Sequence, residues 1–134
     1  MKWHIERIKE IDLSIIRLSG EVSREAFASL LEELFSGGWS RNELLDLSKA
    51  SLFKIKESDI IFWIRKTQEV EKGVLSDRAE NERRSAFFAP QDVNFGVARM
   101  WQTLLELHRS PIVLEVFRTE NEALKWLLSS VYIS

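Results

Sequence analysis

The sequence predicts an α/β domain with a single mixed, mostly parallel sheet of about five strands, in the order β-β-α-β-α-β-α-β-α. Short alternating or β-branched segments recur between amphipathic helical stripes. The first two strands follow each other without a helix, which predicts one antiparallel pair. No repeat or long linker divides the 134 residues, so residues 1–134 are expected to form one domain.

Residues 3–10 alternate between apolar and polar side chains over a short stretch, which is typical of an edge strand. A second strand is predicted over residues 13–18, which contain the β-branched pair Ile15 and Ile16. Gly20 is expected to end this strand. The spacing of the two segments favours an antiparallel hairpin.

The clearest helix begins after Ser23, a good N-cap residue. Its apolar residues recur with helical spacing: Phe27, Leu30, Leu31, Leu34 and Phe35. Gly37 and Gly38 predict its end. A short strand is then expected over residues 43–47, followed by a loop over residues 48–52.

The next helix is predicted to begin at Ser58, which we interpret as its N-cap. Residues 60–64 alone could also form a buried strand. We favour a helix because the polar continuation over residues 65–72 has no breaker before Gly73. Residues 74–84 are rich in charge and predict a loop or a frayed extension of the helix.

The second half predicts two further strand–helix units. A strand over residues 85–89 is followed by a long helix capped by Asp92, and a strand over residues 112–117 is followed by a helix with the capping box of Thr119 and Glu122. Gly96 lies inside the long helix, where glycine costs about 1 kcal/mol relative to alanine. We interpret Gly96 as a point of close packing against the sheet, with room for a ligand as the alternative.

The composition argues against several classes of function. Nineteen basic and 21 acidic residues give a net charge of −2, so no strong field favours nucleic acid. The chain has no cysteine, which excludes disulfides and thiolate metal sites and suits a cytoplasmic protein. The N-terminal residues do not have the pattern of a signal peptide. The longest apolar run, residues 60–64, is too short to span a membrane.

The polar residues do not form an evident catalytic or metal-binding pattern. His4 and His108 are the only histidines and belong to distant elements, whereas a metal site needs three or four ligands and a hydrolytic triad needs a nucleophile and a carboxylate. We therefore expect no enzyme activity, no metal and no cofactor. Ser48, Ser51 and Ser58 are the candidates for a phosphorylation site or a partner-binding loop.

The apolar residues suggest two surfaces for binding. Ile61 and Phe62 lie off the main stripe of their helix, so this helix must bury a second face. A homodimer, or a protein partner, that contacts this helix would bury it. Trp63, Phe95 and Trp101 could instead line a pocket for an apolar small ligand.

Three segments of the second half carry a resemblance to a known family: residues 89–101 (APQDVNFGVARMW), 116–119 (VFRT) and 122–127 (EALKWL). They resemble the C-terminal half of STAS/SEC14-like proteins related to the SpoIIAA anti-anti-sigma factor, and residues 45–48 (LDLS) resemble the central strand of that family. The resemblance implies a STAS-type fold, usually without enzymatic activity. Its better-known members switch partners by serine phosphorylation or bind small apolar ligands. This chain has Lys56-Glu57-Ser58-Asp59 where the phosphorylated members have Asp-Ser-Ser-Gly.

The sequence therefore favours a non-catalytic protein-interaction or regulatory module. The alternative is a small protein that binds an apolar or lipid-like ligand, which requires a cavity of roughly a few hundred Å³ between sheet and helices. A hydrolase or transferase is the third hypothesis, and it requires a nucleophile and a base near His4 or His108.

Overall fold

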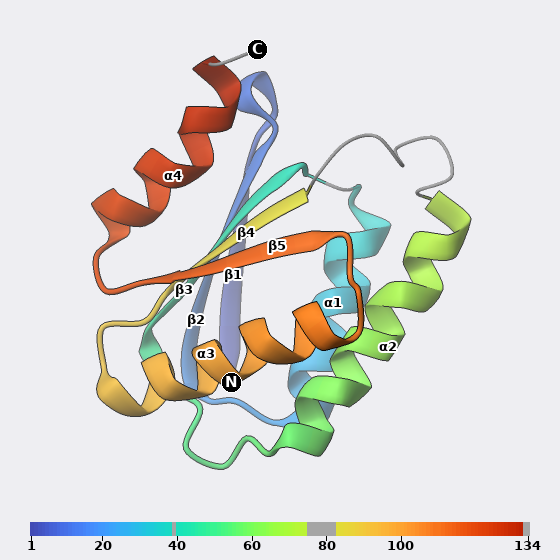
Figure 1. Cartoon of the computed structure of the whole chain (residues 1–134), viewed down its shortest axis with the longest axis vertical. Helices are drawn as coiled ribbons and strands as arrows, with labels where there is room; N and C mark the ends of the chain where they lie inside the picture. Colours follow the sequence, from blue (N-terminus) through green and yellow to red (C-terminus); the bar gives the residue numbers. More distant parts are fainter. Residues whose placement is uncertain (39, 75–82, 133–134) are drawn as a thin grey trace.

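A computed structural model describes residues 1–38, 40–74 and 83–132, and it confirms the predicted α/β fold class. One five-stranded sheet has the order β1-β2-β3-β4-β5, so each strand lies beside its neighbour in sequence (Figure 1). The strands are β1 (Lys2–Ile8), β2 (Leu13–Glu21), β3 (Asn42–Ser51), β4 (Arg83–Phe88) and β5 (Ile112–Phe117). β1 is antiparallel to β2, as predicted, and the other neighbours are parallel.

The helices cover the two faces of the sheet unequally (Figure 1). The helices α1 (Arg24–Ser36), α2 (Glu57–Val74) and α3 (Asp92–Leu107) pack on one face, and α4 (Glu120–Tyr132) packs on the other. A short 3-10 helix, η1 (Lys9–Ile11), joins β1 to β2. Because side chains of a strand alternate between faces, β3 sends Leu45 and Leu47 toward the three helices and Leu44 toward α4.

Aromatic side chains connect the three helices to the sheet. Trp63 of α2 is only 1 % exposed, and its ring centroid lies 4.6 Å from that of Phe27 and 5.0 Å from that of Trp101. Trp101 also meets Phe87 of β4 edge-on at 5.0 Å. The indole Nε1 of Trp63 donates to the carbonyl oxygen of Arg24 at 3.0 Å, so the buried polar atom is satisfied.

The strand β3 is longer than the sequence predicts. The expected loop over residues 48–52 was wrong, because the backbone continues to pair with β2 as far as Ser51. The register between β2 and β3 shifts after Arg17, which indicates an irregularity of the β-bulge type. The sequence does not indicate this extension, because Ser48 and Ser51 are poor strand formers. The parallel pairing of β3 with β2 outweighs their low strand preference.

Two predicted helix starts also need correction. Ser23 caps α1 as predicted, with its side chain accepting a hydrogen bond from the Ala26 N–H at 3.2 Å. Ser58 is not an N-cap, because α2 already begins at Glu57. Asp92 is the first residue of α3, and Gln91 occupies the N-cap position. Most of the loop predicted over residues 74–84 lies outside the described residues.

The interpretation of Gly96 as a close-packing position was wrong. Gly96 is exposed, and a Cβ placed on it would meet no heavy atom within 4 Å outside its own helix. Gly96→Ala is therefore expected to raise the free energy of unfolding by about 0.5–1 kcal/mol, because alanine loses less backbone entropy on forming the helix. Urea unfolding of the two proteins measures the difference. An unchanged or lower stability would show that this glycine meets a steric or functional demand.

Candidate functional site

The loop between β3 and α2, residues 52–56, presents the most exposed large apolar side chain among the described residues. Leu52 and Ile55 are buried in the core, so side chains on both sides of Phe53 in the sequence point into the protein. Phe53 itself is 76 % exposed. This loop lies at the carboxyl end of the parallel strands, beside the start of α3 (Figure 1), which is where open α/β sheets usually bind their ligands.

Asn94 of α3 holds this loop in place. Its side chain is 3 % exposed. Its Oδ1 accepts a hydrogen bond from the Leu52 N–H at 3.0 Å, and its Nδ2 donates to the carbonyl oxygens of Leu47 and Ala50 at 3.1 and 2.9 Å. Further support comes from Gln91, whose Nε2 donates to the Ser48 carbonyl at 2.6 Å. The backbone on the N-terminal side of Phe53 is therefore fixed by the first turn of α3.

The loop also carries hydrogen bonds of its own. The Phe53 N–H donates to Ser51 Oγ at 3.4 Å, and the Ile55 N–H donates to the Leu52 carbonyl at 3.0 Å. We call residues 52–56 with the exposed Val93 of α3 the Phe53 surface. A contact residue on a backbone of this kind loses little conformational entropy when a partner binds.

The charges around the Phe53 surface are largely paired. Lys54 Nζ lies 3.0 Å from Glu21 Oε1, and Arg24 Nε lies 2.8 Å from Asp59 Oδ1. Burial alone would raise the pKa of Asp59, but hydrogen bonds from the Lys56 N–H and from Arg24 outweigh it and hold the pKa below its usual value. Asp59 therefore stays ionised and anchors the start of α2 to α1.

The three predicted serines lie near this surface in different environments. Ser48 Oγ donates to Asp46 Oδ1 at 2.6 Å, whereas Ser51 Oγ accepts from the backbone of Phe53. Ser58 is exposed in the first turn of α2, and its Oγ accepts from Arg24 Nη2 at 3.3 Å. The structure thus brings Ser51 and Ser58 to the two ends of the loop that carries Phe53.

The second apolar face of α2 is largely used within the chain. This helix lies between α1 and α3 (Figure 1), and Ile61 is half-buried against the core. Phe62 is 41 % exposed, with the Arg24 guanidinium 5.1 Å from its ring centroid. The neighbouring helices therefore bury part of the surface that suggested a homodimer, and that contact stays a prediction.

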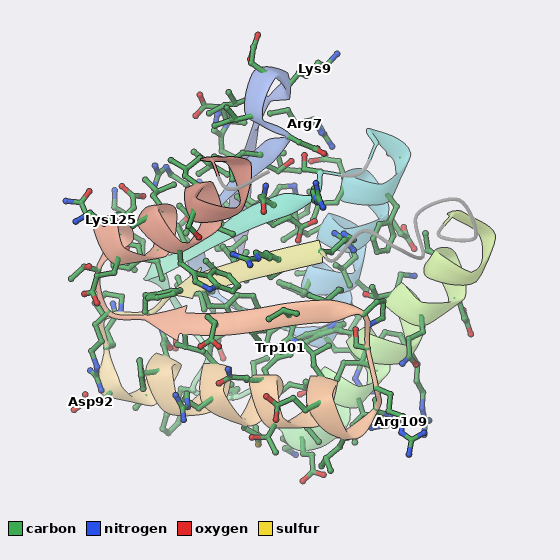
Figure 2. The ribbon with its side chains drawn as sticks, turned by 45° about the horizontal axis from the view of Figure 1, so that its top comes forward. Arg7, Lys9, Asp92, Trp101, Arg109 and Lys125 are labelled. Atoms are coloured by element: carbon green, nitrogen blue, oxygen red, sulfur yellow. The ribbon has the colours of Figure 1, made fainter. Side chains whose placement is uncertain are left out.

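Trp63, Phe95 and Trp101 do not line one ligand pocket. Trp63 and Trp101 border a cavity of about 70 Å³ between the sheet and the helices, and Trp101 lies between β5 and α3 in Figure 2. Phe95 lies elsewhere, under Arg118 at 4.2 Å. Ligand pockets usually measure about 300–1,000 Å³. The alternative of an apolar ligand held between sheet and helices has no support in this cavity.

A polar groove lies on the face of the sheet that α4 only partly covers. Arg17 Nη1 bonds to Asp46 Oδ2 at 2.7 Å and to Glu120 Oε1 at 2.6 Å, and Lys2, His4, Ser48 and Lys49 also line the groove. The hydrogen bond to Glu120, followed by that to Asp46, raises the pKa of Arg17. Burial opposes ionisation of Asp46, yet hydrogen bonds from Ser48 and Arg17 lower its pKa. One guanidinium thus bonds both carboxylates, so each of these three groups has a partner of opposite charge.

Within residues 1–38, 40–74 and 83–132, neither His4 nor His108 lies in an arrangement typical of a catalytic site. Neither imidazole makes a hydrogen bond there, and no cluster of three metal-ligating side chains occurs in that part of the chain. The expectation that the chain is not an enzyme stays a prediction. No described helix is both long enough and apolar enough to cross a bilayer.

Sequence reasoning missed Phe53, which the Phe53 surface presents, and Asn94, which fixes the backbone beneath it. The signal for Phe53 was available: a phenylalanine in a non-periodic segment between Leu52 and Lys54, before a helix start. The signal for Asn94 was weaker, because asparagine in a first helical turn is usually explained by local capping. Its partners lie more than 40 residues away in sequence.

Comparison with known proteins yields only remote similarity. No protein-family model matches the chain, and no curated protein matches it. Solved structures similar to it include an uncharacterised DUF3478-family protein with a SpoIIAA-like fold from Shewanella loihica PV-4 (17 % identity, TM-score 0.46, covering 94 % of this chain and 92 % of that one). Two others are the anti-sigma factor antagonist SpoIIAA in its unphosphorylated form (15 %, 0.46, 93 % and 96 %) and an anti-sigma factor antagonist from Mycobacterium paratuberculosis (14 %, 0.47, 94 % and 92 %). Function therefore has to be argued from the residues of this chain.

Proposed function

We propose that this chain is a non-catalytic, regulatory protein-interaction module that binds a protein partner through the Phe53 surface. The observation that supports the proposal is the exposure of Phe53 on a backbone fixed by Asn94. Each Å² of apolar surface that stays in contact with water costs about 25 cal/mol, and burying the exposed phenylalanine against a partner would recover this free energy. Interfaces use buried aromatic anchors surrounded by a polar rim, and here Lys54, Lys56 and Glu21 supply such a rim.

The chemistry of the surface indicates the kind of partner. The partner should offer an apolar pocket for Phe53 with acidic groups at its margin, since Lys54 and Lys56 flank the phenylalanine. Lys54 is already paired with Glu21, so the charges would set orientation and association rate more than affinity. The fixed backbone favours binding with little rearrangement of this chain.

Phe53→Ala is expected to weaken binding of the partner about tenfold or more, since truncating an aromatic anchor costs about 2 kcal/mol or more. Affinity capture with quantitative mass spectrometry would identify the partner, and calorimetry with the purified proteins would give the dissociation constants. Leu107→Ala is the matched control, because Leu107 is 71 % exposed at the far end of α3.

Equal affinity of the Phe53→Ala and Leu107→Ala variants for every captured protein would contradict the proposal. Binding of the wild-type chain to anionic vesicles, lost in Phe53→Ala, would also contradict it and would assign the surface to a membrane. Both variants should keep the stability of the wild type within about 0.5 kcal/mol, because exposed side chains contribute little to folding.

Phosphorylation of the predicted serines would act at the rim of the same surface. A phosphoryl group on Ser58 would lie beside Arg24 at the start of α2, where the helix dipole favours an anion, although Glu57 and Asp59 oppose it. Ser48 is the least suited of the three, because its hydroxyl faces the ionised Asp46. We keep Ser51 and Ser58 as the sites at which modification would regulate binding.

A further inference from the structure

The two edges of the sheet differ in how much of their backbone is available to a partner. At β5, Gln102 of α3 donates from Nε2 to the Leu114 carbonyl oxygen at 2.8 Å, so a side chain of the same protein occupies part of this strand. At the other edge, β1 pairs with β2 through all seven of its residues. Within the described part of the chain, no other strand pairs with β1 and no side chain bonds to its backbone. An unpaired strand edge is a template for strand addition.

The sequence of β1 is complementary to itself in the antiparallel sense. A two-fold axis through Ile5 would pair His4 with Glu6 of a second copy, and Glu6 with its His4. The same axis would place Trp3 opposite the Arg7 of the second copy, and Ile5 opposite Ile5. Every residue from Lys2 to Ile8 then has a partner, and no like charges face each other.

We propose that the chain forms a homodimer in which two β1 strands pair antiparallel about Ile5, joining two five-stranded sheets into one. The occupant of this edge is thus a second copy of the same chain. The side chains of His4 and Glu6 are exposed and make no hydrogen bond within the described part of the chain, so they are available for the partner strand.

The faces of the strand agree with this pairing. Trp3 and Arg7 point toward α1, where Trp3 Nε1 donates to Glu33 at 3.0 Å and Arg7 Nη2 donates to the Leu34 carbonyl at 3.5 Å. His4 and Glu6 alternate with them and point to the opposite face, which is open at the polar groove. A two-fold axis perpendicular to the sheet joins each face of one sheet to the same face of the other. Residues that lie opposite each other across the axis must therefore point to the same face.

Neighbouring registers of the same symmetry fit less well. An axis through Glu6 would oppose two glutamates, and an axis through His4 would oppose two histidines and leave Ile8 without a partner. The axis through Ile5 is the one of these three that pairs the full strand without opposing like charges. The proposed β1 pairing depends on no feature of the Phe53 surface. An experiment can therefore contradict the homodimer without contradicting the proposed function, and the reverse.

Charge reversal tests the proposed pairing. His4→Glu would face Glu6 twice across the axis and is expected to weaken the dimer about tenfold or more in sedimentation velocity. The double variant His4→Glu, Glu6→Lys replaces the two repulsive pairs with two opposite-charge pairs and should recover the wild-type dissociation constant within about threefold. Lys9→Glu is the control, since Lys9 lies just beyond the paired residues. Circular dichroism should be unchanged in all three variants.

Cysteine cross-linking tests the register, because the chain has no cysteine of its own. A mixture of His4→Cys and Glu6→Cys proteins should form a disulfide-linked heterodimer, whereas His4→Cys alone should not cross-link. A monomer at high micromolar concentration would overturn the proposal. So would a dimer that is insensitive to the charge reversal, or one lost on Phe62→Glu, which would assign the contact to α2.

Discussion

Trp63→Ala is expected to lower the free energy of unfolding by about 3–5 kcal/mol, the cost typical of removing a buried large aromatic side chain. Trp63 contacts aromatic rings of both α1 and α3, at 4.6 Å from Phe27 and 5.0 Å from Trp101. Its removal therefore leaves a cavity where three helices meet, and it leaves the Arg24 carbonyl without its indole donor. Guanidinium unfolding followed by circular dichroism would measure the change.

Two controls separate the packing effect from a general sensitivity of α2. Phe62→Ala, one residue away on the same helix, should cost less than about 1 kcal/mol, because its ring is partly in solvent. Trp63→Phe keeps most of the volume and loses the N–H, so its cost should fall between the two. A loss for Trp63→Ala no larger than that for Phe62→Ala would refute the central role of this tryptophan.

Asn94→Ala is expected to lower the free energy of unfolding by about 3–5 kcal/mol, because a buried N–H and two buried carbonyl oxygens lose a partner together. Those groups belong to Leu47, Ala50 and Leu52, at the end of β3 and the start of the loop. Hydrogen exchange at the Leu52 amide should accelerate by more than the global loss of stability predicts. Binding through the Phe53 surface should also weaken, although Asn94 is buried.

Gln91→Ala is the matched control for Asn94, since Gln91 bonds to the same segment from an exposed position. Its loss should cost about 1 kcal/mol or less. Asn94→Asp should resemble the alanine variant, because a carboxylate accepts a hydrogen bond from Leu52 but donates none to the two carbonyl oxygens. Wild-type exchange at Leu52 in the Asn94→Ala variant would show that the loop is fixed by other contacts.

The fold was predictable because its determinants are local. Periodic apolar residues, the cap at Ser23 and the double glycine after α1 mark the elements, and the missing helix between the first two strands marks the hairpin. The end of β3 was not predictable in the same way. Ser48 and Ser51 favour a turn locally, and only pairing with β2 across the bulge keeps them in the strand.

The candidate site was less predictable than the fold for a related reason. Whether an apolar residue in a loop is buried depends on the path of the backbone. All three of Leu52, Phe53 and Ile55 are apolar, yet only the side chain of Phe53 points into solvent. That direction is fixed by Asn94, whose partners are remote in sequence. Gly96 is a second residue whose surroundings the sequence does not reveal. A glycine within a helix suggested close packing, but the structure has open space beside it.

The sequential order of the strands has a consequence for how the chain acquires its structure. Because each strand joins the one made just before it, the sheet can grow in the direction of synthesis, with each new strand–helix unit adding to a finished edge. The parallel pairs still join residues far apart in sequence, such as Leu13 with Asn42 and Asn42 with Arg84, and pairing of this kind forms more slowly than local contacts. The helix α4, which follows all five strands in the sequence, covers Leu44 and Ala86 from the opposite side, so a nascent chain that has not yet reached α4 would leave this apolar face in contact with water.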